Sequence, residues 1–265
     1  HLKEAIAAAN KDYTRLKNLK LTGEIGENDF IFMRDSMNSL QSLNMKEVTV
    51  YGHFGRHPGL PDNYFGDDQE REGVLTSNAF NEKNSLVRII LPDKLKLIGE
   101  CAFRNCVNLT GSITIPEGVT HIGPSAFLWC NSLTGSLSLP STLEYIGGGG
   151  AVDIGGAFNG CHFNCELKLP SNLKYIGHYA FANNPGYYGS LILPEKLEYI
   201  GDNAFGGDQN LTGNLTIPQG VKAINQGAFS GTGFNGTLQL HDGLASINQG
   251  AFSGVPLKGE LNLPK

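Results

Sequence analysis

The sequence is poor in charge and has no cluster of positive charge. Charged residues make up 17% of its 265 positions, the net charge at pH 7 is −5, and no run of Lys or Arg occurs. Nucleic-acid-binding domains carry a concentrated basic surface, and membrane-surface segments carry clustered Lys and Arg. No apolar stretch approaches the roughly 18 residues of a membrane span. We therefore expect no nucleic-acid partner and no membrane insertion of this fragment.

Cysteine is also scarce. There are five cysteines, and an odd number excludes a complete disulfide framework. Cys106, Cys130 and Cys161 each stand three residues after the Phe of an Ala-Phe pair. Recurrence at one repeat position is typical of a packed column of small, polarisable side chains, so we predict buried thiols, no metal site and no cofactor. Cys161 and Cys165 are near enough for a local disulfide in an oxidising compartment, and the sequence leaves that alternative open.

Glycine, in contrast, is abundant, with 35 residues, and it accompanies an internal repeat. Ala-Phe pairs recur every 23 or 24 residues with one exception, and their phenylalanines are Phe80, Phe103, Phe127, Phe158, Phe181, Phe205, Phe229 and Phe252. The exception is 31 residues long, because GGGGAVDIGGAF carries seven extra residues between Ile146 and Phe158. An insertion that leaves the repeat intact on both sides belongs on a loop.

Each repeat contains two short apolar segments. Residues 113–115 alternate like a strand and end at Pro116, which cannot donate to a β-ladder. The second segment, residues 119–122, adds two more aliphatic side chains. One repeat alone cannot bury these side chains, whereas stacked repeats bury them against one another. The pattern predicts a right-handed solenoid of stacked, parallel, short β-strands.

The residue after the second isoleucine of each repeat is glycine or asparagine. Both residue types tolerate a positive φ. We therefore predict left-handed backbone at all seven positions, which are Gly99, Gly123, Gly147, Gly177, Gly201, Asn225 and Asn248.

The beginning of the chain follows a different pattern. Residues 2–14 have the apolar spacing of an amphipathic helix. A second helix is expected to start with Asn28 or Asp29 as its N-cap. Its apolar face consists of Phe30, Met33, Met37 and Leu40. Terminal repeats are commonly atypical because they cover the exposed end of a solenoid, so these helices predict an N-terminal α-helical cap.

These patterns divide the chain into three parts of one domain. Residues 1–50 are expected to form the cap of helix and strand–helix repeats, 51–74 an irregular loop, and 75–265 the solenoid. The chain opens HLKEAIAAAN without an initiator Met and ends part-way through a repeat at GELNLPK. We expect it to be part of a longer protein.

The repeat wording is similar to that of a known family. LxxIxLP at residues 86–92 and IGxxAFxxC at residues 98–106 resemble the BspA-like (Treponema-type) leucine-rich-repeat family. The resemblance covers residues 75–265 strongly and residues 16–50 through LxxLxL spacing. It implies a bacterial surface or secreted solenoid that adheres to host proteins or neighbouring cells. The family offers no shared catalytic residues.

One outward repeat position carries four successive aromatic residues, His121, Tyr145, Tyr175 and Tyr199. Parallel strands lie about 4.8 Å apart, so these side chains are expected to form an exposed stripe. Tyrosine suits protein and sugar ligands alike, and the inserted loop, with Asp153, is placed to shape a site beside the stripe. The alternative is that stacked aromatics only stabilise neighbouring strands.

A hydrolytic or metal-binding loop is a third interpretation. It would require His53, His57, Asp67 and Asp68 to converge, although the Gly and Pro residues around the histidines exclude the helix that would aim both at one metal.

The sequence therefore favours a non-enzymatic binding or adhesion module, located at the cell surface or secreted. Its expected partner is a host or bacterial surface protein or a glycan. The alternative is a structural spacer that presents another domain.

Overall fold

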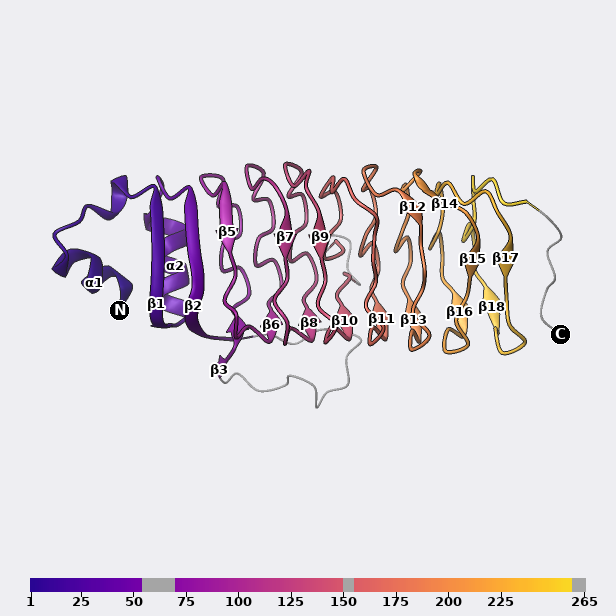
Figure 1. Cartoon of the computed structure of the whole chain (residues 1–265), viewed down its shortest axis with the longest axis horizontal. Coiled ribbons are helices and arrows are strands. Elements are labelled where there is room, and N and C mark those ends of the chain that lie inside the picture. The colour runs from indigo at the N-terminus through magenta and orange to yellow at the C-terminus, as the bar shows by residue number, and fades with distance from the viewer. Residues whose placement is uncertain (54–69, 150–154, 259–265) are drawn as a thin grey trace.

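The computed structural model describes residues 1–53, 70–149 and 155–258, and it shows an elongated solenoid (Figure 1). The repeats stack side by side along the long axis, with the helical cap at one end and the last strands at the other. This confirms the predicted leucine-rich-repeat solenoid of short parallel strands with a helical cap.

The cap already carries the repeat register. Its elements are α1 (Leu2–Ala8), the 3-10 helix η1 (Tyr13–Arg15), β1 (Asn18–Ile25), α2 (Glu27–Ser36) and β2 (Ser42–Gly52). β1 and β2 pair in parallel, with Asn18 opposite Ser42, 24 residues later. α2 runs alongside these two strands (Figure 1). The cap is therefore the first coil of the same solenoid rather than a separate unit.

The two helices differ from their predicted bounds. The first ends at Ala8 instead of residue 14, because Asn10 adopts a left-handed φ of 50°. The Asp12 carboxylate then accepts the Thr14 main-chain N–H at 2.9 Å and starts the 3-10 turn. The second helix begins at Glu27, before the predicted N-cap at Asn28 or Asp29.

Asp29 fixes the two helices to each other. Its carboxylate accepts the main-chain N–H of Leu2 at 2.7 Å and that of Gly26 at 3.2 Å, so it satisfies a donor at the start of each helix. The four residues predicted to form the apolar face of α2, Phe30, Met33, Met37 and Leu40, are fully buried, but the helix ends at Ser36, so Met37 and Leu40 reach the core from the segment that follows it.

The remaining strands are short, and nearly all pair in parallel. They are β3 (Arg71–Glu72), β4 (Val74–Leu75), β5 (Arg88–Ile90), β6 (Leu97–Ile98), β7 (Ile113–Thr114), β8 (His121–Ile122), β9 (Leu137–Ser138), β10 (Tyr145–Ile146), β11 (Tyr175–Ile176), β12 (Gly189–Ser190), β13 (Tyr199–Ile200), β14 (Leu211–Thr212), β15 (Leu215–Thr216), β16 (Ala223–Ile224), β17 (Leu238–Gln239) and β18 (Ser246–Ile247). The second strands of successive coils form the sheet β13-β11-β10-β8-β6-β4. β3 and the first residue of β4 lie within the stretch 51–74, of which residues 54–69 are outside the described residues.

A stack of phenylalanine rings runs through the interior. Successive rings of the Ala-Phe pairs lie 4.9–5.7 Å apart with interplanar angles of 2–14°. The stack crosses the seven-residue insertion unbroken, with Phe127 and Phe158 at 5.4 Å. It reaches the cap through an edge contact between Phe30 and Phe80 at 5.7 Å. The insertion therefore leaves the core register unchanged.

The predicted left-handed backbone at the Gly/Asn positions is wrong. None of the seven residues has a positive φ. Left-handed residues stand two before and two after the Phe in every coil except that of Phe158, where only Gly160, two after, has a positive φ; Cys101 and Asn105 around Phe103 are an example. Glycine follows the second isoleucine for a different reason, because a Cβ on Gly123 would lie 2.7 Å from the Glu100 nitrogen of the preceding coil. At Gly123 glycine is required by close backbone approach and not by φ, whereas the coils of Asn225 and Asn248 accommodate a side chain at this position.

The predicted thiol column is confirmed and has a polar function. Cys106, Cys130 and Cys161 are fully buried, and each Sγ donates at 3.0 Å to the carbonyl oxygen of the Phe in the preceding coil. Asn184 continues the column through its Nδ2, which donates to the Phe158 carbonyl at 2.9 Å. All five cysteines are free, so Cys161 and Cys165 do not form the disulfide that the sequence allowed.

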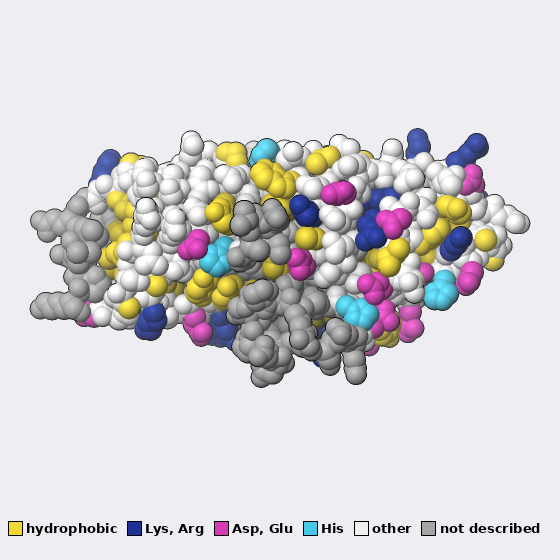
Figure 2. Space-filling model, turned by 180° about the vertical axis from the view of Figure 1, so that it is seen from behind, with side chains coloured by type: hydrophobic (Ala, Val, Ile, Leu, Met, Phe, Trp, Pro, Cys, Tyr) yellow, Lys and Arg dark blue, Asp and Glu magenta, His cyan; other side chains and the backbone are white. Residues whose placement is uncertain are grey.

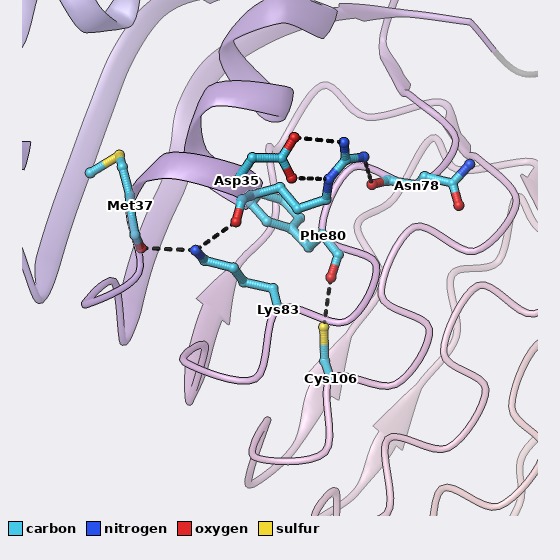
Figure 3. A network of polar contacts seen from close by, with 7 residues as sticks. Asp35, Met37, Asn78, Phe80, Lys83 and Cys106 are labelled. Carbon is cyan, nitrogen blue, oxygen red and sulfur yellow. Dashed lines mark hydrogen bonds and ion pairs between the residues drawn. The ribbon is translucent and has the colours of Figure 1, made fainter. Parts of the chain in front are cut away.

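Lys83 occupies the same repeat position at the junction with the cap. Its buried Nζ donates to the main-chain carbonyls of Arg34 at 2.9 Å and Met37 at 2.8 Å (Figure 3). These carbonyls lie at the C-terminal end of α2, where the last turn of a helix leaves acceptors unpaired. Lys83 thus joins the helical coil to the first Ala-Phe coil.

Candidate functional site

The aromatic residues predicted to form a ladder do stack. His121, Tyr145, Tyr175 and Tyr199 lie opposite one another in register on β8, β10, β11 and β13. Their ring centroids are 5.5, 4.5 and 4.6 Å apart, with interplanar angles of 25°, 16° and 7°. The row results from the repeat period, which places each ring directly over the next.

The expectation that all four rings are exposed is wrong. His121 and Tyr145 are only 4% and 3% exposed, whereas Tyr175 and Tyr199 are partly exposed. The buried Val74 and Leu97 occupy the same repeat position in the two preceding coils and form an apolar cluster next to His121. Burial lowers the pKa of His121 to about 4 and raises that of Tyr145 to about 12. The inner half of the row is thus a second apolar layer.

The exposed half of the row has polar and aromatic neighbours. The Tyr199 hydroxyl lies 3.3 Å from Nε2 of His178. Nδ1 of His178 lies 2.9 Å from the main-chain nitrogen of Asp202 and 3.2 Å from its carboxylate. We call this surface the tyrosine edge, and its members are Tyr175, His178, Tyr199 and Asp202.

His178 and Asp202 were not among the residues predicted from the sequence. His178 follows Gly177 directly, and Asp202 follows Gly201 at the same repeat position one coil later. The signal that could have identified them is the one-coil correspondence that also defines the aromatic row.

A row of charged residues runs beside the tyrosines. Lys174 Nζ lies 2.7 Å from a carboxylate oxygen of Glu144 in the preceding coil. The hydrogen bond from Lys174 lowers the pKa of Glu144. Both side chains are partly exposed, so the pair contributes little to stability but gives the edge a defined polar border.

The other candidates from the sequence are tested only in part. Asp153, His57, Asp67 and Asp68 lie outside the described residues. His53 contacts the Glu27 carboxylate through Nδ1 at 2.9 Å, at the border of a cavity of about 820 Å³ in the cap. Across residues 1–53, 70–149 and 155–258, no group of three or more His, Cys, Asp or Glu side chains is placed to hold a metal ion.

The distribution of charged side chains on the surface agrees with the absence of a basic cluster in the sequence. On the face shown in Figure 2, Lys and Arg side chains are interspersed with Asp and Glu, and no broad basic area appears among the described residues. Within that part of the chain, no helix combines the length and the apolar character needed to cross a bilayer.

The fold and the site together define a leucine-rich-repeat module of the protein-interaction type. The model of the family described as "BspA type Leucine rich repeat region" matches residues 73–149 and 136–258. The chain belongs to this family, which confirms the resemblance seen in the sequence. No match was found among curated proteins.

Solved structures of bacterial leucine-rich-repeat proteins are similar to this chain. One from Bacteroides ovatus ATCC 8483 is 24% identical, with 95% of this chain and 67% of that chain covered and a TM-score of 0.52. The T. pallidum leucine-rich-repeat protein is 27% identical, with coverage of 66% and 65% and a TM-score of 0.40. The chain thus spans about two thirds of the length of each. The first similarity supports the fold.

Proposed function

We propose that the chain is a non-enzymatic adhesion module, exposed at a bacterial surface or secreted, that recognises a protein through the tyrosine edge. The observation that carries this proposal is the pair of parallel, partly exposed rings of Tyr175 and Tyr199, 4.6 Å apart on a rigid sheet. Tyr side chains dominate binding energy at protein interfaces because they bury a large area at low entropic cost.

The neighbours of the two rings add specificity. The contacts between Tyr199, His178 and Asp202 hold a phenol, an imidazole and a carboxylate in fixed positions. A preorganised surface loses little conformational entropy on binding. The ionised Glu144–Lys174 pair borders the rings as the polar rim of a typical interface does.

The family supports the same kind of activity, since leucine-rich-repeat solenoids present extended surfaces on a stack of repeats. The runner-up is a spacer that holds another domain away from the cell. The continuous stack of phenylalanines favours it, because such a core makes the solenoid a stiff rod. An adhesion module binds a partner through the tyrosine edge, whereas a spacer does not, so a binding measurement distinguishes the two proposals.

The test is a screen of the chain against purified host extracellular-matrix proteins, bacterial surface proteins and a glycan array. The variant Tyr175→Ser/Tyr199→Ser removes both rings, and Ile90→Ser, an exposed apolar residue on β5, is the matched control. A protein hit that is lost in the double variant but kept in the control supports the proposal. If no protein binds the wild type, the spacer is favoured. A hit that survives the double variant contradicts the assignment to the tyrosine edge.

A further inference from the structure

A groove lies on the first-strand column of the solenoid, away from the second-strand sheet that carries the tyrosines. Its volume is about 440 Å³, within the range of about 300–1,000 Å³ of small-molecule sites. Its lining comes from three successive coils and consists of Ser136, Leu137, Ser138, Leu139, Cys165, Glu166, Lys168 and Tyr188. No residue of the tyrosine edge takes part in it.

The groove exists because two coils separate locally. β7 and β9 pair in register, with Ile113 opposite Leu137. In the next coil the segment from Phe158 to Leu167 is one residue shorter than that from Phe127 to Leu137. Glu166 bridges to Tyr188 of the following coil, and no described hydrogen bond joins the main chains of residues 137–139 and 166–168. One edge of β9 is therefore open to the groove.

Both ends of the groove are closed by hydrogen bonds. The Asn164 main-chain N–H donates to the Gly135 carbonyl at 3.0 Å, and the Asn172 side chain donates to the Ser141 carbonyl at 2.9 Å. The opening is thus a short bounded slot. An added peptide strand requires an edge that is open at its ends, so the slot fits a compact ligand better than a peptide.

The lining has the chemistry of a carbohydrate site. Tyr188 is 48% exposed and offers a ring face together with a hydroxyl group. Across the groove, the Ser138 hydroxyl can both donate and accept, whereas the Ser136 hydroxyl donates to Ser112 Oγ at 3.1 Å and is left as an acceptor. Lys168 Nζ and Glu166 Oε2 lie 3.7 Å apart, so their charges offset each other at the rim. An aromatic face beside neutral and compensated polar groups matches a sugar ring, which has C–H faces and hydroxyl edges.

We propose that this groove binds a neutral saccharide of one or two rings, stacked on Tyr188 and hydrogen-bonded by Ser136, Ser138, Glu166 and Lys168. The paired charges disfavour an anionic ligand, because Glu166 would repel it. This site is independent of the proposed protein-binding function, since it uses different residues on a different strand column. Either proposal holds if the other fails.

Cys165 provides a reporter for occupancy. It lines the groove and is partly exposed, whereas the other four cysteines are buried. A saccharide bound against Tyr188 covers the approach to its sulfur. Alkylation of Cys165 by iodoacetamide should therefore slow several-fold when the groove is filled, while the buried cysteines stay unreactive throughout.

The experiment is a glycan array of neutral and acidic oligosaccharides, followed by titration calorimetry and Cys165 alkylation with each hit. We expect a neutral saccharide to bind, Tyr188→Ala to weaken binding at least about tenfold, and the saccharide to protect Cys165. Tyr188→Phe, which keeps the ring, should retain most of the affinity. Tyr175→Ser/Tyr199→Ser is the control and should leave this affinity unchanged.

Three results would overturn the proposal. The first is the absence of binding to any neutral saccharide at millimolar concentration. The second is a neutral hit that Tyr188→Ala leaves intact or that does not protect Cys165. The third is binding that Tyr175→Ser/Tyr199→Ser abolishes, which would place the sugar on the tyrosine edge.

Discussion

The Asp208 carboxylate accepts the main-chain N–H of Asn184 through Oδ1 at 2.8 Å, while its Oδ2 is buried and has no hydrogen-bond partner in the structure. Asp208 stands three residues after Phe205, at the repeat position where Cys161 and Asn184 donate to a carbonyl of the preceding coil. A carboxylate can only accept, whereas a protonated carboxyl can also donate. The position therefore favours the neutral acid, and burial raises the pKa of Asp208 well above its usual range.

We predict that Asp208→Asn stabilises the protein at neutral pH. The native state retains a proton on Asp208 that the unfolded chain releases above about pH 4, so stability falls as the pH rises from that value toward the raised native pKa. An amide supplies a donor at every pH and should add about 1–3 kcal/mol at pH 7. Urea unfolding from pH 4 to 8 should show a flatter curve for the variant.

The matched control for that series is Asn184→Asp, one coil earlier, which removes a donor that three main-chain carbonyls use. It should destabilise the protein and steepen the decline with pH. A variant Asp208→Asn that is less stable than the wild type at pH 7 would refute the neutral-acid assignment.

His121 should lower the stability of the solenoid as the pH falls, whereas Asp208 lowers it as the pH rises. Its pKa is lowered to about 4, first by burial and then by Lys174, with Glu144 acting the other way. The unfolded chain takes up a proton below about pH 6.5, but native His121 remains neutral until about pH 4. Stability should therefore be complete above pH 6.5 and decrease by about 2 kcal/mol between pH 6.5 and 4.5.

The measurement is the difference in unfolding free energy between wild type and His121→Leu across this pH window. Leucine is chosen as the replacement because Leu97 occupies this repeat position in the preceding coil. Contributions of other groups, Asp208 included, cancel in the difference. A difference that does not change with pH would mean that His121 titrates normally and is more accessible than the structure shows.

The repeat period was sufficient to predict the pairing of strands, but side-chain environment needed the structure. The offsets between Tyr145, Tyr175 and Tyr199 gave the register of three coils directly. They did not give exposure, because alternation says which side of a strand a residue faces and not how closely neighbouring rings pack. Tyr145 is buried, whereas Tyr175 at the same repeat position is partly exposed.

The shortened segment beside Tyr188 is visible in the sequence, but the groove is not. The segment from Phe158 to Leu167 is one residue short. Spacing alone cannot distinguish a shorter turn from a local separation of two coils, because either accommodates the missing residue. The separation is seen in the structure, where no described hydrogen bond joins the main chains of residues 137–139 and 166–168.

Lys83 is predicted to hold the cap on the solenoid. Lys83→Met preserves the length of the side chain but leaves the carbonyls of Arg34 and Met37 without their donor (Figure 3). Buried unsatisfied acceptors cost about 1–3 kcal/mol each. We expect faster hydrogen exchange in α2 and a loss of about 2–4 kcal/mol in unfolding free energy. Lys94→Met, on an exposed turn, is the control and should change neither quantity.

Substitution by asparagine should destabilise the protein at a glycine in close backbone contact, such as Gly123, and should be tolerated at a glycine in an open left-handed turn, such as Gly254. At Gly123 a Cβ would lie 2.7 Å from the Glu100 nitrogen and 2.9 Å from the Gly99 carbonyl carbon, so Gly123→Asn must push two coils apart. Overpacking of this kind costs about 1–3 kcal/mol.

At Gly254, φ is +73° and the nearest atom to a Cβ is 3.9 Å away, and asparagine tolerates left-handed backbone. Gly254→Asn should therefore stay within about 1 kcal/mol of the wild type in thermal or urea unfolding. Equal tolerance at both positions would contradict the close backbone approach at Gly123, and a large loss at Gly254 would contradict its open left-handed turn.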